Sequence, residues 1–346
     1  MNVTIVKAKP MSKSITVSSV AYVHMDDVDP EKHLSAIPIN EAMNVAIVLA
    51  INALENPTGA YSDFQRATMQ TCLRSAQSTH AAIRKVLSWG EEDPMSVDAL
   101  ALARLPLESL YNMCMFTESP DWVDVYVRDG WKKQYEQFLL QREETKKLKR
   151  YDEYSNKKGP HHLAAVGKTI GITKVQVATI EHEQLGTPMP GGLVPDHIPQ
   201  FPTPGRAINK LPKDGDKRRM LERLYPEYVF LCSFAHGLPD ANLFKMMFNK
   251  DSKFRDYWSD AELKDTFRRN VAARSYVTSL LGMIQSAAEL TALYPGDVEL
   301  MAGVTKAWEE MSRDSLLGKA IWNIRTKKLL GVIDAPPAAQ ESRPNV

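Results

Sequence analysis

Residues 222–244 read ERLYPEYVFLCSFAHGLPDANLF, and their apolar run predicts one helix that carries a polar stripe. Tyr228, Cys232 and His236 recur every four residues, so they share a face of that helix. Ser233 lies next to the stripe. A glycine and then a proline follow soon after His236 and end the helix, because neither residue continues it favourably. This face offers a phenol, a thiol, a hydroxyl and an imidazole, and we expect the chemistry of the chain to lie here.

Helical patterns continue on both sides of this stretch. Residues 40–54 are apolar nearly all round, which predicts a buried helix. Ser62 and Ser259 each stand three residues before a glutamine or glutamate, the capping-box arrangement that starts a helix, and Asp297 is a further N-cap. The helix that starts after Ser259 is predicted to be amphipathic and to run to about residue 293.

Alternating β-branched residues, the signature of strands, occur only near the N-terminus. We therefore expect an all-α fold, a multi-helix bundle with a short β-rich N-terminal arm. A proline- and glycine-rich stretch in the middle of the chain lacks a helical period and predicts a loop that is either functional or a linker. The expected parts are the β-rich arm at 1–38, the first half of the bundle at 39–184, the loop at 185–216, the second half at 217–333, in one core with the first, and a disordered tail at 334–346.

Composition bounds the class of protein. The chain has 346 residues, 44% of them hydrophobic, and a net charge of +1, which is ordinary for a globular protein and argues against a surface built wholly for nucleic acid or anionic lipid. Cys72, Cys114 and Cys232 are far apart and form no metal-binding pair, as expected for buried thiols in a reducing compartment. The sequence shows neither a signal peptide nor a membrane-spanning stretch, so we expect a cytoplasmic protein.

The second informative stretch is residues 99–117, in which Arg104 and Glu108 are the only charged residues, with Pro106 between them. The surrounding leucines predict a buried helix, and the proline is expected to bend it. Because an unpaired buried charge costs several kcal/mol, Arg104 and Glu108 should pair or face a polar cleft. They are either a structural ion pair that fixes the register of the bundle or part of a functional site.

Several chemistries have no sequence signature here. The chain lacks a glycine-rich phosphate loop, an HExxH zinc motif and a GxSxG nucleophile elbow. His161 and His162, and likewise His182 between two glutamates, lack the spacing of zinc ligands. We therefore expect no cofactor and no metal site.

Charge is unevenly distributed along the chain. The segment 142–219, which begins at Arg142 and ends at Arg219, has fifteen Lys and Arg against nine Asp and Glu. A basic rim of this kind would suit an anionic ligand such as RNA, whose binding depends on phosphate contacts. The alternative is a solvated helix end without a partner. The proline-rich loop inside this segment is a candidate contact for a protein partner.

The two informative helices together resemble the paired signatures of a poorly characterised bacterial all-helical family, grouped with HEPN-like and abortive-infection proteins. Its Arg-x-x-x-Glu pattern is matched at Arg104 and Glu108, and its Tyr-x-x-x-x-Ser-x-x-His pattern at Tyr228, Ser233 and His236. The resemblance implies an α-helical bundle and a defence or toxin-type effector as the biological class, without a settled activity. In HEPN ribonucleases the arginine and histidine lie a few residues apart on one helix, and here the preceding arginine is thirteen residues before the histidine.

Our leading hypothesis is a polar pocket for an anionic ligand, built from Arg104, Glu108, Tyr228, Ser233 and His236. If the protein is an enzyme, we expect metal-independent RNA cleavage, with His236 as general acid or base, Arg104 stabilising charge on the phosphorus centre and Glu108 orienting Arg104. The competing hypothesis is a non-catalytic interaction or sensor module in which these residues only specify packing.

Overall fold

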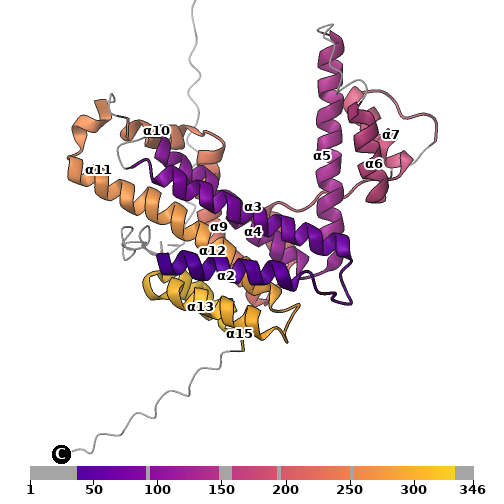
Figure 1. Cartoon of the computed structure of the whole chain (residues 1–346). Coiled ribbons are helices and arrows are strands. Elements are labelled where there is room, and N and C mark those ends of the chain that lie inside the picture. Colours follow the sequence, from indigo (N-terminus) through magenta and orange to yellow (C-terminus); the bar gives the residue numbers. More distant parts are fainter. Residues whose placement is uncertain (1–36, 91–93, 148–157, 193–195, 250–252, 332–346) are drawn as a thin grey trace, which may run out of the picture.

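A computed structural model describes residues 37–90, 94–147, 158–192, 196–249 and 253–331 (Figure 1). Within these ranges every regular element is a helix and none is a strand, which confirms the all-α prediction. The predicted disordered tail at 334–346 lies outside the described residues. So does the predicted β-rich arm at 1–38, except for its last two residues, which begin the first helix. The longer helices are α2 (Ile37–Ala53), α3 (Asp63–Leu87), α4 (Asp98–Phe116), α5 (Pro120–Lys147), α6 (Gly159–Thr169), α7 (Lys174–Leu185), α9 (Asp216–Ala235), α10 (Pro239–Met247), α12 (Arg274–Leu290) and α13 (Val298–Asp314). The shorter ones are η1 (Pro94–Val97), α8 (Pro204–Lys210), η3 (Lys253–Tyr257), α11 (Asp260–Thr266), η4 (Phe267–Ala273), α14 (Leu316–Ile321), η5 (Trp322–Thr326) and α15 (Lys327–Leu329).

Helix α12 is the centre of the bundle. Every residue from Ser275 to Leu290 is buried, and α2, α3, α4 and α13 pack around the helix (Figure 1). The sequence prediction of one long helix that starts after Ser259 is confirmed as far as Leu290, because α11, η4 and α12 follow one another without a break. The predicted amphipathic character is wrong for α12, which is enclosed on all sides, and the helix passes through a π-helical segment at η4. Its serine, threonine and glutamine side chains resemble a surface stripe, but they lie inside the protein.

Helices α4 and α12 approach each other most closely at Gly282. A Cβ atom at this position would lie 2.7 Å from the carbonyl oxygen of Pro106, so only glycine fits. Pro106 is buried, and α4 continues through it as one helix. The proline therefore lies at a helix contact.

The main hydrophobic core runs through both halves of the chain and contains residues from α2 to α14. A second, smaller cluster lies apart from it, between the far half of α5 and the helices α6 and α7. In Figure 1, α5 extends away from the bundle, with α6 and α7 alongside it. Trp131 of α5 packs closely against Gly167 of α6, where an added Cβ would lie 2.9 Å from the indole ring. Residues 159–185 form two helices, α6 and α7.

The sequence predicted a loop over residues 185–216, but part of this segment is helical. Residues Pro204–Lys210 form α8, with Thr203 at the N-cap position and a proline at the start of the helix. Ala207 and Ile208 are buried, so α8 is held against the bundle by apolar contacts. A helix of about two turns is too short to give a periodic signal, which explains why the sequence pattern missed it.

The predicted helix starts are confirmed. Ser62 forms a complete capping box with Gln65, and Ser259 forms one with Glu262. The Asp297 side chain accepts a hydrogen bond from the backbone N–H of Leu300. These signals were readable because each cap and its partner lie within one helical turn.

Candidate functional site

Helices α4 and α9 pack side by side and bring four of the five candidate residues together. Nη1 of Arg104 lies 3.4 Å from Nε2 of His236. Nε of the same guanidinium lies 3.5 Å from Oε1 of Glu108. The Tyr228 hydroxyl donates a hydrogen bond of 2.9 Å to that same carboxylate oxygen. The result is a continuous chain of polar contacts, His236–Arg104–Glu108–Tyr228, which we call the α4–α9 cluster.

The α4–α9 cluster lies at the edge of the bundle. The side chains of Arg104 and Glu108 are 21% and 29% exposed, and His236 is exposed. The sequence predicted a buried helix around the pair, and the opposite face of α4 is indeed buried, but the charged face reaches solvent. His236 is the C-cap residue of α9, so its side chain leaves the end of the helix rather than its middle.

Ser233 stands apart from the other candidates. It is buried, and its hydroxyl donates to the backbone carbonyl of Phe230, one turn earlier in the same helix. This back-bonding is a common arrangement for serine inside a helix and directs the hydroxyl towards its own backbone. Although Ser233 lies next to the stripe in the sequence, its side chain therefore does not join the α4–α9 cluster.

Two phenols flank Glu108, and both keep their protons at neutral pH. Burial raises the pKa of Tyr228 well above its usual range, and the neighbouring Cys232 and Glu108 raise it further. Burial, with smaller effects of Cys72 and Glu108, raises the pKa of Tyr126 to about 12. Burial also raises the pKa of the Cys72 thiol to about 11. These groups are hydrogen-bond donors, and Cys72 is a poor nucleophile because its thiolate is disfavoured.

Glu108 also lines a small pocket of about 150 Å³ between α3, α4 and α5. Cys72 and Tyr126 form part of its wall. Sequence patterns did not connect these two residues with Glu108, because they belong to helices whose contact with α4 depends on the tertiary fold. Helical periodicity places a residue on a face and does not say which helix covers that face.

The C-terminal end of the predicted basic segment is neutralised by carboxylates. Lys217 is buried, and its ammonium lies 3.0 Å from a carboxylate oxygen of Glu118. Arg218 donates to Glu222 over 2.7 Å, and Arg219 lies 3.6 Å from Asp216. A basic rim at residues 142–219 would have to use other cations of the segment.

A second charged cluster was not singled out by the sequence and lies deep in the core. Glu289 is fully buried and receives two hydrogen bonds from Arg325, of 3.0 and 2.9 Å. Gln285 donates to the same carboxylate, and Thr326 donates to Gln285. Because Glu289 is enclosed and its oxygens are occupied, we assign this cluster to the stability of the fold.

Within the described ranges, no three side chains of His, Cys, Asp or Glu gather in a metal-binding arrangement. None of the described helices has the length and apolar character to span a lipid bilayer. A scan against protein-family models, a search of curated proteins and a search of solved structures each found no match to the chain.

Proposed function

We propose that the chain binds RNA at the α4–α9 cluster and cleaves it without a metal ion. The observation that carries the proposal is the contact between Arg104 and His236 at the solvent-exposed edge of the bundle. A guanidinium group and an imidazole side by side are the groups that bind a phosphodiester and move a proton next to it.

The direction of this contact assigns a role to each nitrogen. A guanidinium group only donates hydrogen bonds, so Nε2 of His236 must accept from Arg104 and carries no proton in this arrangement. Nε2 becomes available as a general base when Arg104 turns to the phosphate and releases it. His236 therefore acts first as the base, and Arg104 supplies the positive charge.

Glu108 and Tyr228 position Arg104. The carboxylate lies against one edge of the guanidinium group, and the tyrosine hydroxyl bonds to the same carboxylate. Because Tyr228 stays protonated, it remains a donor to Glu108 throughout the neutral range. Glu108 also reduces the net charge of the site, so the cluster favours one phosphate group over a long run of phosphates.

The reaction that fits is transesterification. His236 removes the proton of a ribose 2′-hydroxyl, the 2′-oxygen attacks the neighbouring phosphorus, and the bond from phosphorus to the 5′-oxygen breaks. Arg104 stabilises the additional negative charge on the phosphorus centre. The leaving 5′-oxygen takes a proton from water, and the products are a 2′,3′-cyclic phosphate and a free 5′-hydroxyl.

The test is RNA cleavage by the purified protein in the presence of a chelator. We expect His236→Ala to lower the cleavage rate by about a hundredfold or more, the usual contribution of a general base. His161→Ala is the matched control, because His161 is an exposed histidine on the distant helix α6. Circular dichroism establishes that the variants are equally folded. Equal cleavage by wild type and His236→Ala, or no cleavage by wild type, would remove the proposal.

A second candidate function is supported by apolar side chains on the surface. Leu243 and Met246 of α10 lie three residues apart on one helix face and are 49% and 47% exposed, and Leu238 just before α10 is 46% exposed. Such side chains are typical of protein contacts when they are clustered. In this proposal the chain is an interaction module, and the α4–α9 cluster only specifies packing.

The two candidates make different predictions for the double variant Arg104→Met, Glu108→Leu. As an interaction module the protein keeps its melting temperature and its partner, because apolar replacement of an ion pair is often tolerated. As a ribonuclease it loses RNA binding and cleavage. A folded double variant that no longer binds RNA would favour the first candidate.

A further inference from the structure

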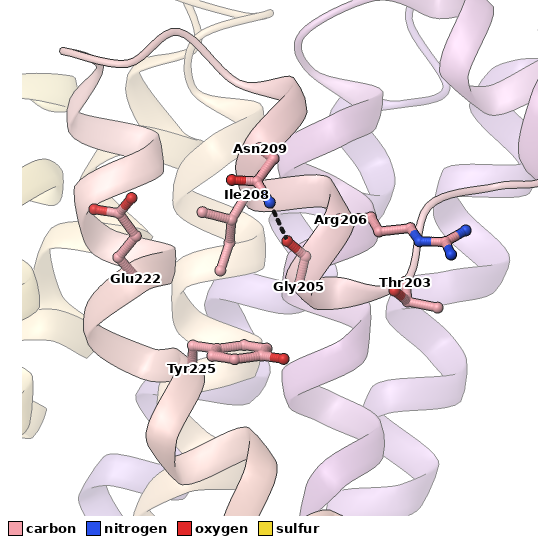
Figure 2. A pocket seen from close by; sticks show the side chains of 7 residues that line it. All are labelled: Thr203, Gly205, Arg206, Ile208, Asn209, Glu222 and Tyr225. Carbon is pink, nitrogen blue, oxygen red and sulfur yellow. Dashed lines mark hydrogen bonds between the residues drawn. The ribbon is translucent and has the colours of Figure 1, made fainter. Parts of the chain in front are cut away.

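A surface cavity of about 510 Å³, open to solvent, lies between α8 and α9 (Figure 2). The ring of Tyr225, which is 37% exposed, forms its floor, and Ile208 of α8 faces that ring. Pockets of this size accommodate small organic ligands. The exposed part of the Tyr225 ring is a surface on which a flat ring system can stack.

The Tyr225 ring is held in place from two sides. It stacks on the Tyr228 ring, with 6.1 Å between the ring centroids and 25° between the planes. At the hydroxyl end of the ring, a Cβ atom at Gly205 would lie 2.8 Å from the Tyr225 hydroxyl, so the absence of a side chain there admits the ring. The floor of the cavity is therefore continuous, through Tyr228, with the α4–α9 cluster.

Polar groups lie around this floor. The Asn209 amide nitrogen donates to the Gly205 carbonyl over 3.3 Å, and Figure 2 shows its amide oxygen on the side of Glu222. One carboxylate oxygen of Glu222 accepts from Arg218 over 2.7 Å. Arg206 is exposed and extends from α8 in the direction opposite to Glu222. The cavity thus has acceptor oxygens at one end and a cation at the other.

We infer that this cavity is a nucleotide subsite for the RNA strand whose phosphodiester binds at the α4–α9 cluster. The inference rests on the proposed function. Single-stranded RNA is recognised through unstacked bases that lie on aromatic rings, with polar groups at their edges and cations at their phosphates. The cavity offers all three: Tyr225 for the base, Asn209 and Glu222 for donor groups on its edge, and Arg206 for a phosphate.

The subsite and the cleavage site are separate contact points on one strand. Tyr225 and His236 are eleven residues apart on α9, which corresponds to about 16 Å along the helix. One nucleotide therefore does not fill both sites. The subsite selects the nucleotide that is held near the scissile bond, so it is the source of sequence preference. The acceptor oxygens of Asn209 and Glu222 favour bases that carry an exocyclic amine.

The experiment measures binding of CMP, of ribose 5-phosphate and of a short single-stranded RNA by isothermal titration calorimetry. We expect CMP to bind more tightly than ribose 5-phosphate and the RNA more tightly than CMP. Tyr225→Leu should weaken CMP binding by about fivefold or more, the lower range for loss of base stacking. The matched control is Tyr257→Leu, because Tyr257 is 84% exposed and lies far along the chain from α8 and α9.

A second pair of variants tests the geometry without removing the ring. Gly205→Ala should displace the Tyr225 hydroxyl and weaken CMP binding, and Tyr225→Phe in the same chain should restore part of it. CMP binding that Tyr225→Leu and Gly205→Ala leave unchanged would overturn the subsite. Tighter binding of free CMP than of RNA would overturn its role in holding a strand. Weaker CMP binding in these variants supports the subsite even if RNA cleavage proves independent of His236, so the two proposals fail separately.

Discussion

Replacing His80 by glutamine is expected to remove a pH dependence from the stability of the protein. His80 of α3 is only 3% exposed and lies in a buried polar network. Its Nδ1 lies 2.7 Å from the Ser279 hydroxyl of α12, and its Nε2 lies 3.2 Å from the Asn40 side-chain oxygen of α2. The network joins three helices, so the protonation state of His80 affects the packing of the core.

The magnitude follows from the pKa. Burial, and to a smaller extent the positive charge of Arg84, lowers the pKa of His80 from 6.5 to about 4. Between these values the unfolded chain binds a proton that the folded protein does not, so the free energy of unfolding falls as the pH falls. The contribution is complete above about pH 6.5, and its loss amounts to about 3 kcal/mol by pH 4, since each pKa unit corresponds to about 1.4 kcal/mol.

The assay is urea unfolding followed by circular dichroism, at several pH values from 7 to 4. His80→Gln keeps polar atoms in the network and does not titrate, so we expect it to be less stable than wild type at pH 7. The difference between the two proteins should shrink by about 3 kcal/mol towards pH 4. His161→Gln, at an exposed position, controls for the effect of removing a histidine. Parallel pH profiles for wild type and His80→Gln would refute the reasoning.

Three further substitutions test contacts in the core by thermal or urea unfolding. Gly282→Ala should lower the free energy of unfolding by about 1–3 kcal/mol, because the new methyl group meets the rigid backbone of Pro106; an unchanged stability would contradict the close approach. Arg325→Met should cost about 3 kcal/mol by removing the two hydrogen bonds of Arg325 to the buried Glu289, which keeps only the more distant cation of Lys217 at 3.9 Å, and adding Glu289→Leu should recover most of the loss. Ser62→Ala should cost about 1 kcal/mol through loss of the helix cap, which a shift in the urea midpoint would report.

The sequence predicted those features that depend on neighbours along the chain. Helix starts at Ser62, Ser259 and Asp297 were readable because cap and partner are separated by one turn. The proximity of Arg104 to His236 was only a hypothesis from the sequence, since the two residues are 132 positions apart and nothing local links their helices.

The burial of α12 shows that a pattern of polar and apolar residues does not reveal which polar side chains find hydrogen-bond partners inside the protein. A serine such as Ser286 counts as polar in the sequence, but its hydroxyl donates to the Gly282 carbonyl of its own helix, over 2.6 Å. Glu289 is accommodated by Arg325, which is 36 residues further along the chain. A polar residue whose hydrogen bonds are made inside the protein does not need water, and the partners that satisfy it are supplied by tertiary structure.

Helix α4 connects the core with the candidate site. Pro106 lies two residues from both Arg104 and Glu108, so helical geometry places it on the face opposite to theirs. That face packs against α12 at Gly282, at a distance that leaves no room for a side chain. Because the buried face of α4 is fixed at this point, the positions of Arg104 and Glu108 relative to α9 are fixed as well. A displacement of α4 caused by Gly282→Ala should therefore change the contact of Arg104 with His236, although the substitution lies on the other side of the helix.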